Sequence, residues 1–160
     1  MATITHCISF SAVFLATITI LCAGQVTASD FCKGASYKPL CRSLAKGFSN
    51  AEEATKASIN NLIVQTYRAR ASASRLGKDQ KAQTCVENYD DAIDSLKKSL
   101  KFLQARDKGS VRTFISASIS AYSTCTDAYE EFGVHCPFSR SNTLMEHTAS
   151  SCLSIYSNVR

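Results

Sequence analysis

Turn-forming residues are scarce in this chain, and that scarcity limits the folds available to it. Only two prolines and six glycines occur among 160 residues. Proline and glycine are the strongest local breaks in regular structure, so a chain with so few of them should consist of long helices joined at a small number of connections. A length of 160 residues also suits one small domain, which excludes a multidomain enzyme.

Apolar residues recur at alternating steps of three and four in four segments, which is the spacing of one helix face. The inward faces are expected to run along residues 59–76, 82–103, 111–132 and 145–159. Asn50 can cap the first of these helices, with Glu53 reaching back as in a capping box, and Gly77 can end it. The fourth helix is expected to start near Ser141 or Asn142.

Short connections between four such helices predict an all-α fold, an antiparallel up-and-down four-helix bundle around a shared seam. The bundle is expected over residues 50–160. Residues 29–48 form a separate small unit, a short N-terminal helical hairpin in which Pro39 suits the first turn of a helix.

The first 28 residues differ from the rest of the chain in charge. No Lys, Arg, Asp or Glu occurs before Asp30, and residues 8–23 form an apolar run followed by the small-residue pattern Val-Thr-Ala at 26–28. This arrangement is typical of a secretory signal peptide. We therefore expect export, removal of residues 1–28, and no membrane segment afterwards. A retained anchor is the alternative, although the run is shorter than the ~20 residues that a spanning helix needs.

Six cysteines follow the expected signal, and an even number in an oxidising compartment indicates disulfides. Spacing alone does not choose among the fifteen connectivities. The helix layout favours one pair, because Cys85 near the start of the second bundle helix and Cys125 well along the third are both inward and meet when the helices run antiparallel. The other expected pairs are Cys32 with Cys41, closing the N-terminal unit, and Cys136 with Cys152, for which free thiols or a bridge between chains are the alternative.

The sequence contains none of the common catalytic motifs. G-x-S-x-G, G-x-x-x-x-G-K-[ST] and H-E-x-x-H are all absent. His135, Cys136, His147 and Cys152 form a Cys/His cluster, but His147 and Cys152 are five residues apart on one helix and so point about 140° apart. That separation argues against zinc. We expect no enzyme activity, no catalytic residue, no cofactor and no metal.

The formal net charge is +5, and residues 30–81 contain ten basic and four acidic side chains. Export argues against a nucleic-acid partner, and the basic residues are scattered without interleaved aromatic residues. A solvated surface is the simplest interpretation. Weak attraction to an extracellular polyanion such as pectin is the alternative.

Two segments around cysteines resemble a known family. They read Cys-Val-Glu-Asn-Tyr-Asp-Asp-Ala at 85–92 and Ser-Thr-Cys-Thr-Asp-Ala-Tyr at 123–129. With the signal, the Cys-x8-Cys hairpin and a segment at 136–142 similar to the entry to the last helix, the chain resembles the plant invertase and pectin methylesterase inhibitor family. The segment at 136–142 departs from the family pattern, with Cys136 in place of the usual Ser.

The resemblance implies a secreted, non-catalytic cell-wall protein that binds a carbohydrate enzyme one to one. Pectin methylesterase hydrolyses the methyl esters of polygalacturonate, whereas acid invertase cleaves sucrose. Invertase inhibitors of the family often have a Pro-Lys-Phe motif between the first two bundle helices, and residues 75–81 lack it. We therefore expect inhibition of pectin methylesterase across its substrate cleft. Inhibition of acid invertase and a non-inhibitory bundle remain as alternatives.

An acidic stripe is a candidate for the contact with the target enzyme. Glu87, Asp91 and Asp94 are spaced i, i+4, i+7 on the second bundle helix, on the face opposite its apolar stripe, and should be exposed. Similar positions, together with Thr124 and Asp127 on the third helix, resemble those that pectin methylesterase inhibitors lay across the cleft. A cleft that binds a polyanion should accept carboxylates. The alternative is a helix face that is merely solvated.

Overall fold

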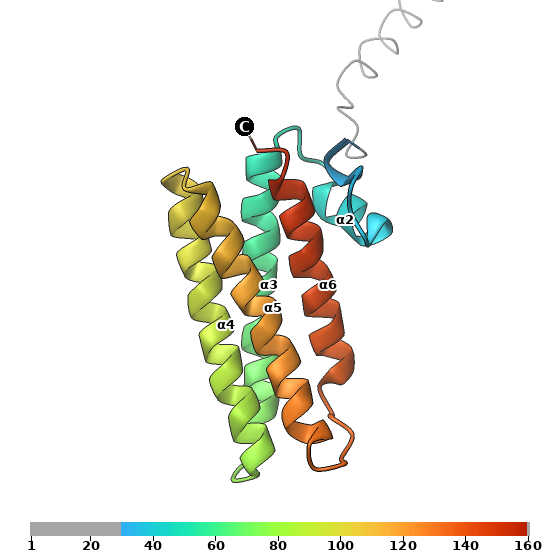
Figure 1. Cartoon of the computed structure of the whole chain (residues 1–160), viewed down its shortest axis with the longest axis vertical. Coiled ribbons are helices and arrows are strands. Elements are labelled where there is room, and N and C mark those ends of the chain that lie inside the picture. The colour runs from blue at the N-terminus through green and yellow to red at the C-terminus, as the bar shows by residue number, and fades with distance from the viewer. Residues whose placement is uncertain (1–29, 160) are drawn as a thin grey trace, which may run out of the picture.

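The computed structural model describes residues 30–159, so the expected signal peptide lies outside the described residues. All regular structure in the described range is helical (Figure 1). The elements are the short 3-10 helix η2 (Asp30–Cys32) and the α-helices α2 (Lys38–Ala45), α3 (Ala51–Ser74), α4 (Gln80–Gln104), α5 (Lys108–Glu130) and α6 (Ser139–Tyr156). The predicted all-α class is therefore confirmed.

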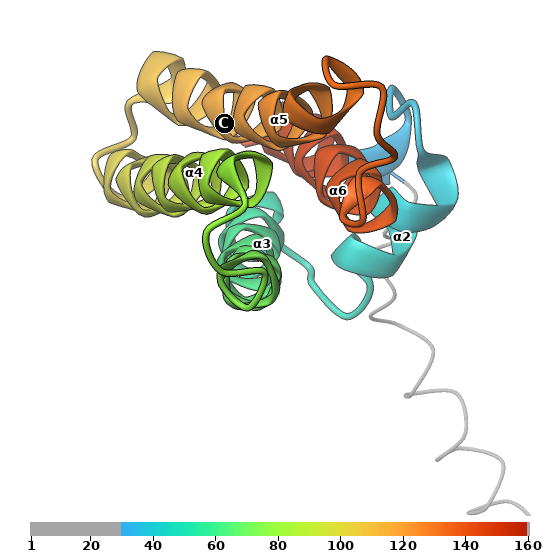
Figure 2. The ribbon, with the colours of Figure 1, turned by 90° about the horizontal axis from the view of Figure 1, so that it is seen from below.

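The four long helices form a closed ring of neighbours. Helix α3 packs against α4, α4 against α5, α5 against α6, and α6 back against α3 (Figures 1 and 2). Helix α2 packs on α6 and α3 rather than on the α4–α5 side. The structure thus confirms the antiparallel bundle with a small N-terminal unit beside it.

Three helix starts are fixed by side-chain caps. Asn50 accepts a hydrogen bond from the backbone N–H of Glu52 at 2.7 Å, and Asp79 and Asp107 cap α4 and α5 in the same way. Capping satisfies amides that the helix itself leaves without acceptors. Because Asp107 acts as the cap, α5 begins at Lys108, slightly earlier than the sequence pattern indicated.

Most of the predicted inward faces are buried or half-buried, but two of their ends are exposed. Leu76 and Phe132 are 49% and 62% exposed, so placing them in the core was wrong. Helix α3 ends at Ser74 and α5 at Glu130, so both residues lie beyond the helical register. Each precedes a glycine with positive φ, Gly77 at 69° and Gly133 at 65°, where the chain reverses.

Buried polar groups tie opposite sides of the bundle together. The Tyr89 hydroxyl donates to Asn142 Oδ1 at 2.7 Å, and Asn142 Nδ2 donates to Thr126 Oγ1 at 3.0 Å. The hydroxyls of Tyr122 and Thr66 lie 2.7 Å apart. Burial raises the pKa of Tyr122 to about 12. Since a buried polar group without a partner is costly, these pairs restrict how the four helices can align.

Two disulfides are formed, Cys32–Cys41 and Cys85–Cys125, the pairs expected from the sequence. The expected third bridge is not formed, because Cys136 and Cys152 are both free and buried. Cys136 precedes α6, whereas Cys152 lies near its far end, about 20 Å along the axis at 1.5 Å per residue. A disulfide needs Cα atoms within about 7 Å. The segment around Cys136 leads into the helix and does not fold back along it.

The N-terminal unit has its own small core. It consists of Cys32, Ala35, Cys41 and Ala45 packed against Ala51, Ala54 and Ile155. Tyr37, just before α2, stacks on His147 of α6 with ring centroids 3.6 Å apart. These contacts hold the unit beside α6 and α3 and leave the outer face of α4 uncovered.

Candidate functional site

The acidic residues expected at an interface lie on the side of the bundle formed by α4 and α5. Asp91 and Asp94 of α4 line a shallow hollow together with Thr124 of α5. Thr124 also lines a second hollow, which contains Asp127. Because they share Thr124, the two hollows adjoin. We call the surface formed by Asp91, Asp94, Thr124 and Asp127 the acidic groove.

Glu87 is the one predicted interface residue that lines neither hollow. It is exposed on the outer face of α4. Asp91, Asp94, Thr124 and Asp127 are exposed as well. The structure therefore brings four of the five predicted side chains into one continuous surface and leaves Glu87 at its margin.

The carboxylates around the groove divide into engaged and free groups. Asp90 forms an ion pair with Arg70 of α3 at 2.6 Å, while Asp79 and Asp107 cap helices. Within residues 30–159, Glu87, Asp91, Asp94 and Asp127 take part in no ion pair. A carboxylate with no partner in the free protein can bind an external donor without breaking an internal contact.

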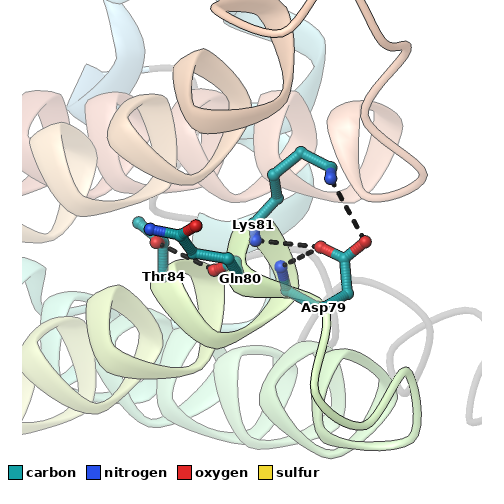
Figure 3. A network of polar contacts seen from close by, with 5 residues as sticks. Asp79, Gln80, Lys81 and Thr84 are labelled. Atoms are coloured by element: carbon teal, nitrogen blue, oxygen red, sulfur yellow. Dashed lines mark hydrogen bonds and ion pairs between the residues drawn. The ribbon is translucent and has the colours of Figure 1, made fainter.

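The start of α4 borders the second hollow and is held in place by a compact polar network (Figure 3). Asp79 Oδ1 accepts from the backbone N–H groups of Lys81 and Ala82 at 2.9 and 3.1 Å. The Lys81 ammonium lies 3.2 Å from the other oxygen. The Ala82 N–H is the main cause of a lowered pKa for Asp79, and Lys81 adds to it.

Lys81 also links this network to the end of α5. Its Nζ lies 5.3 Å from the ring centroid of Phe132 and 5.8 Å from that of Tyr129, within the range of cation–π attraction. Lys81 and the exposed Phe132 ring are therefore neighbours at the rim of the groove.

Sequence reasoning missed several polar residues that line the groove. They are Asn88, Ser95, Lys98 and Ser120 in the first hollow, and Gln80, Lys81, Thr84 and Glu131 in the second. Helical spacing could have placed Asn88, Ser95 and Lys98 beside Asp91 on α4. The residues from α5 could not be found in this way, because they depend on how the two helices are aligned.

No group of three or more His, Cys, Asp or Glu within residues 30–159 is arranged to hold a metal ion. No helix in the same range is long and apolar enough to cross a membrane.

The disulfide-clipped helical bundle presents an open groove whose predicted interface carboxylates have no ion-pair partner within residues 30–159. A sequence profile described as "Plant invertase/pectin methylesterase inhibitor" matches residues 27–155. The chain belongs to this family, which confirms the resemblance found in the sequence. The family is one of enzyme inhibitors and not of enzymes.

Individual relatives agree with the family assignment. A pectinesterase inhibitor from Actinidia deliciosa is 39% identical over 70 residues, which cover 41% of this chain and 38% of that protein's length. A crystal structure of a mutant form of an Arabidopsis pectin methylesterase inhibitor has a TM-score of 0.72 at 16% identity and covers 83% of this chain and 97% of its own. A second crystal structure, of a pectin methylesterase inhibitor from Arabidopsis thaliana, has a TM-score of 0.63 at 17% identity and covers 83% of this chain and 95% of its own. The two solved structures share the fold with this protein.

Proposed function

We propose that this protein inhibits pectin methylesterase by laying the acidic groove across the enzyme's substrate cleft in a one-to-one complex. The observation that supports the proposal most directly is the set of partner-free carboxylates, Glu87, Asp91, Asp94 and Asp127, on one exposed side of the bundle. A cleft shaped for a polyanion offers donors and positive potential to such groups.

Inhibition of acid invertase is the second candidate, because the family name covers both kinds of inhibitor. Two observations favour pectin methylesterase. Residues 75–81, which connect α3 to α4, lack Pro-Lys-Phe, and the Actinidia relative is named a pectinesterase inhibitor. A secreted bundle that inhibits neither enzyme is the third outcome to test.

The proposal includes export to the cell wall. A charge-free segment before Asp30, six cysteines after it and two disulfides suit an oxidising extracellular compartment. We propose that residues 1–28 are removed and that residues 29–160 act as one inhibitor domain. N-terminal sequencing of the protein secreted by plant cells tests the cleavage point. Weak attraction to pectin is part of the same proposal.

The decisive experiment titrates the purified protein into a pectin methylesterase and an acid invertase in parallel. We expect the first enzyme to be inhibited with a one-to-one end point. Asp91→Asn combined with Asp127→Asn should weaken that inhibition by roughly thirty- to a thousand-fold, because two buried charge-assisted contacts are worth about 2–4 kcal/mol.

The matched control is Asp90→Asn combined with Glu53→Gln. It removes the same number of charges, but Asp90 faces Arg70 of α3 and Glu53 lies on α3 itself. Exposed substitutions of this kind change stability by about 0.5 kcal/mol or less. We expect the control to inhibit like the parent. Equal losses of inhibition in both variants would show that the interface lies elsewhere. Inhibition of invertase alone would refute pectin methylesterase as the target.

A further inference from the structure

The charge on the outer face of α4 changes from negative to positive halfway along the helix. Residues 87–94 contain four acidic and no basic side chains, whereas residues 97–101 contain three lysines and no acidic residue. At 100° per residue, all seven side chains fall within an arc of about 120°. Lys97, Lys98 and Lys101 are exposed, and we call them the lysine patch.

Two of the three lysines lie within cation–π distance of aromatic rings on the neighbouring helices. Lys97 Nζ lies 5.6 Å from the ring centroid of Tyr67 on α3, and Lys98 Nζ lies 5.6 Å from that of Phe114 on α5. Phe114 is itself stacked on Phe102 at 5.5 Å. Contact with the Tyr67 side chain raises the pKa of Lys97. Tyr67 and Phe114 come from neighbouring helices, so the sequence of α4 alone does not show their contacts with the lysines.

The lysine patch has no ion-pair partner in the described residues and directly adjoins the acidic groove. Lys98 lines the same hollow as Asp91 and Asp94. Seven residues separate Asp91 from Lys98, which is about 10 Å along the helix axis. One rigid helix therefore presents both signs of charge at a fixed short distance.

We propose that the lysine patch binds the de-esterified, anionic form of pectin. This inference rests on the proposed function, because a pectin methylesterase leaves free carboxylates along its polymer. An inhibitor whose acidic groove lies in the cleft would hold Lys97 and Lys101 beside that groove on the same surface. A polygalacturonate chain presents regularly repeated carboxylates to the lysines, while the 45% exposed Tyr67 ring offers an apolar surface to the sugar.

The test measures binding to the polymer without any enzyme. The purified secreted protein is applied to immobilised polygalacturonate and, in parallel, to fully methyl-esterified pectin. We expect retention on the first polymer only, weakening as salt is added, because exposed charge contacts are screened. The triple variant Lys97→Gln, Lys98→Gln and Lys101→Gln should bind polygalacturonate about tenfold more weakly, as expected for three exposed contacts of a few tenths of a kcal/mol each.

The matched control is Lys33→Gln, Lys38→Gln and Lys46→Gln. These lysines are exposed in the N-terminal unit and give the same change in net charge. We expect the control to bind within about twofold of the parent, since a specific patch and not overall charge is responsible. Equal losses of affinity for polygalacturonate in the two triple variants would refute binding at the lysine patch. Equal binding to esterified pectin would refute recognition of carboxylates.

Inhibition assays separate this inference from the proposed function. With a small soluble ester as substrate, no polymer is present, so the double variant Lys97→Gln and Lys101→Gln, which keeps the groove-lining Lys98, should inhibit pectin methylesterase like the parent. Loss of inhibition in that assay would show that the lysines contact the enzyme instead, which overturns the inference. If the parent inhibits no enzyme, the proposed function fails, and the polymer-binding comparison still decides whether the patch recognises polyuronate.

Discussion

The N-terminal unit and the bundle are stabilised in different ways. The core of the bundle contains large side chains such as Tyr89, Leu96 and Ile115, all fully buried. Apart from Ile155 of α6, the buried core of the N-terminal unit consists of alanines and the two half-cystines, with Phe31, Leu44 and Phe48 packed against it only partly buried. Burying a large apolar side chain stabilises a fold by about 1.5–3 kcal/mol, several times the contribution of an alanine methyl. The bundle can therefore rely on packing, whereas the N-terminal unit depends on its disulfide and on α6.

This difference predicts which part of the molecule each disulfide stabilises. In the bundle, a bridge closes a long loop within one cooperative core, so its removal should lower the stability of the whole domain. In the N-terminal unit, the bridge closes a short loop beside that core, so its removal should release the unit locally.

The largest effect is expected for Cys85→Ala combined with Cys125→Ala. The bridge spans 40 residues, and loss of its constraint on the unfolded chain should cost about 4 kcal/mol. Chemical denaturation monitored by circular dichroism measures this change as a lower midpoint for the entire helical signal. A midpoint equal to that of the parent would mean that the packed core alone determines the stability of the bundle.

A smaller and more local effect is expected for Cys32→Ala combined with Cys41→Ala. The separation is nine residues, and closing so short a loop is worth about 3 kcal/mol at most. We expect amide hydrogens in α2 to lose their protection against exchange while those in α3 to α6 keep theirs. Cooperative unfolding of all helices together would show that the N-terminal unit is part of the bundle core.

The smallest effect concerns the cap of α4. Asp79→Ala should lower the melting temperature by a few degrees at neutral pH, whereas Asp79→Asn, which keeps a capping oxygen, should lower it less. The pKa of Asp79 is depressed in the folded state below 3.8, so the stabilisation is present above that pH and is lost as the pH falls through the folded value.

The difference in melting temperature between the parent and Asp79→Ala should therefore shrink on acidification below about pH 4. A difference that stays the same in acid would mean that the charge of the carboxylate contributes nothing beyond its capping oxygen.

Much of the fold could be predicted because helical periodicity and burial agree along most of the chain. Tyr89, Cys125 and Met145 were placed inward by spacing alone and are buried. Helix ends were less accurate, since the exposed Leu76 and Phe132 continue the apolar period past the points where the chain turns at Gly77 and Gly133. Apolar spacing continues where backbone hydrogen bonding stops, so it does not mark the last turn of a helix.

Contacts that depend on the exact register between helices could not be read from the sequence, although the antiparallel layout was enough to pair Cys85 with Cys125. The hydrogen bond between Tyr89 and Asn142, like the position of Lys98 against Phe114, is set by the relative register of neighbouring helices. The same limit explains the wrong pairing of Cys136 with Cys152, which assumed that the connection before α6 turns back.

The full burial of Cys152 has a practical consequence. Its thiol has no exposed surface, and burial raises its pKa to about 12, so almost no reactive thiolate exists at neutral pH. An alkylating reagent can therefore modify it only during moments when the bundle opens. The rate of that modification, followed by mass spectrometry, therefore measures how often the bundle opens, and it does so at a native residue.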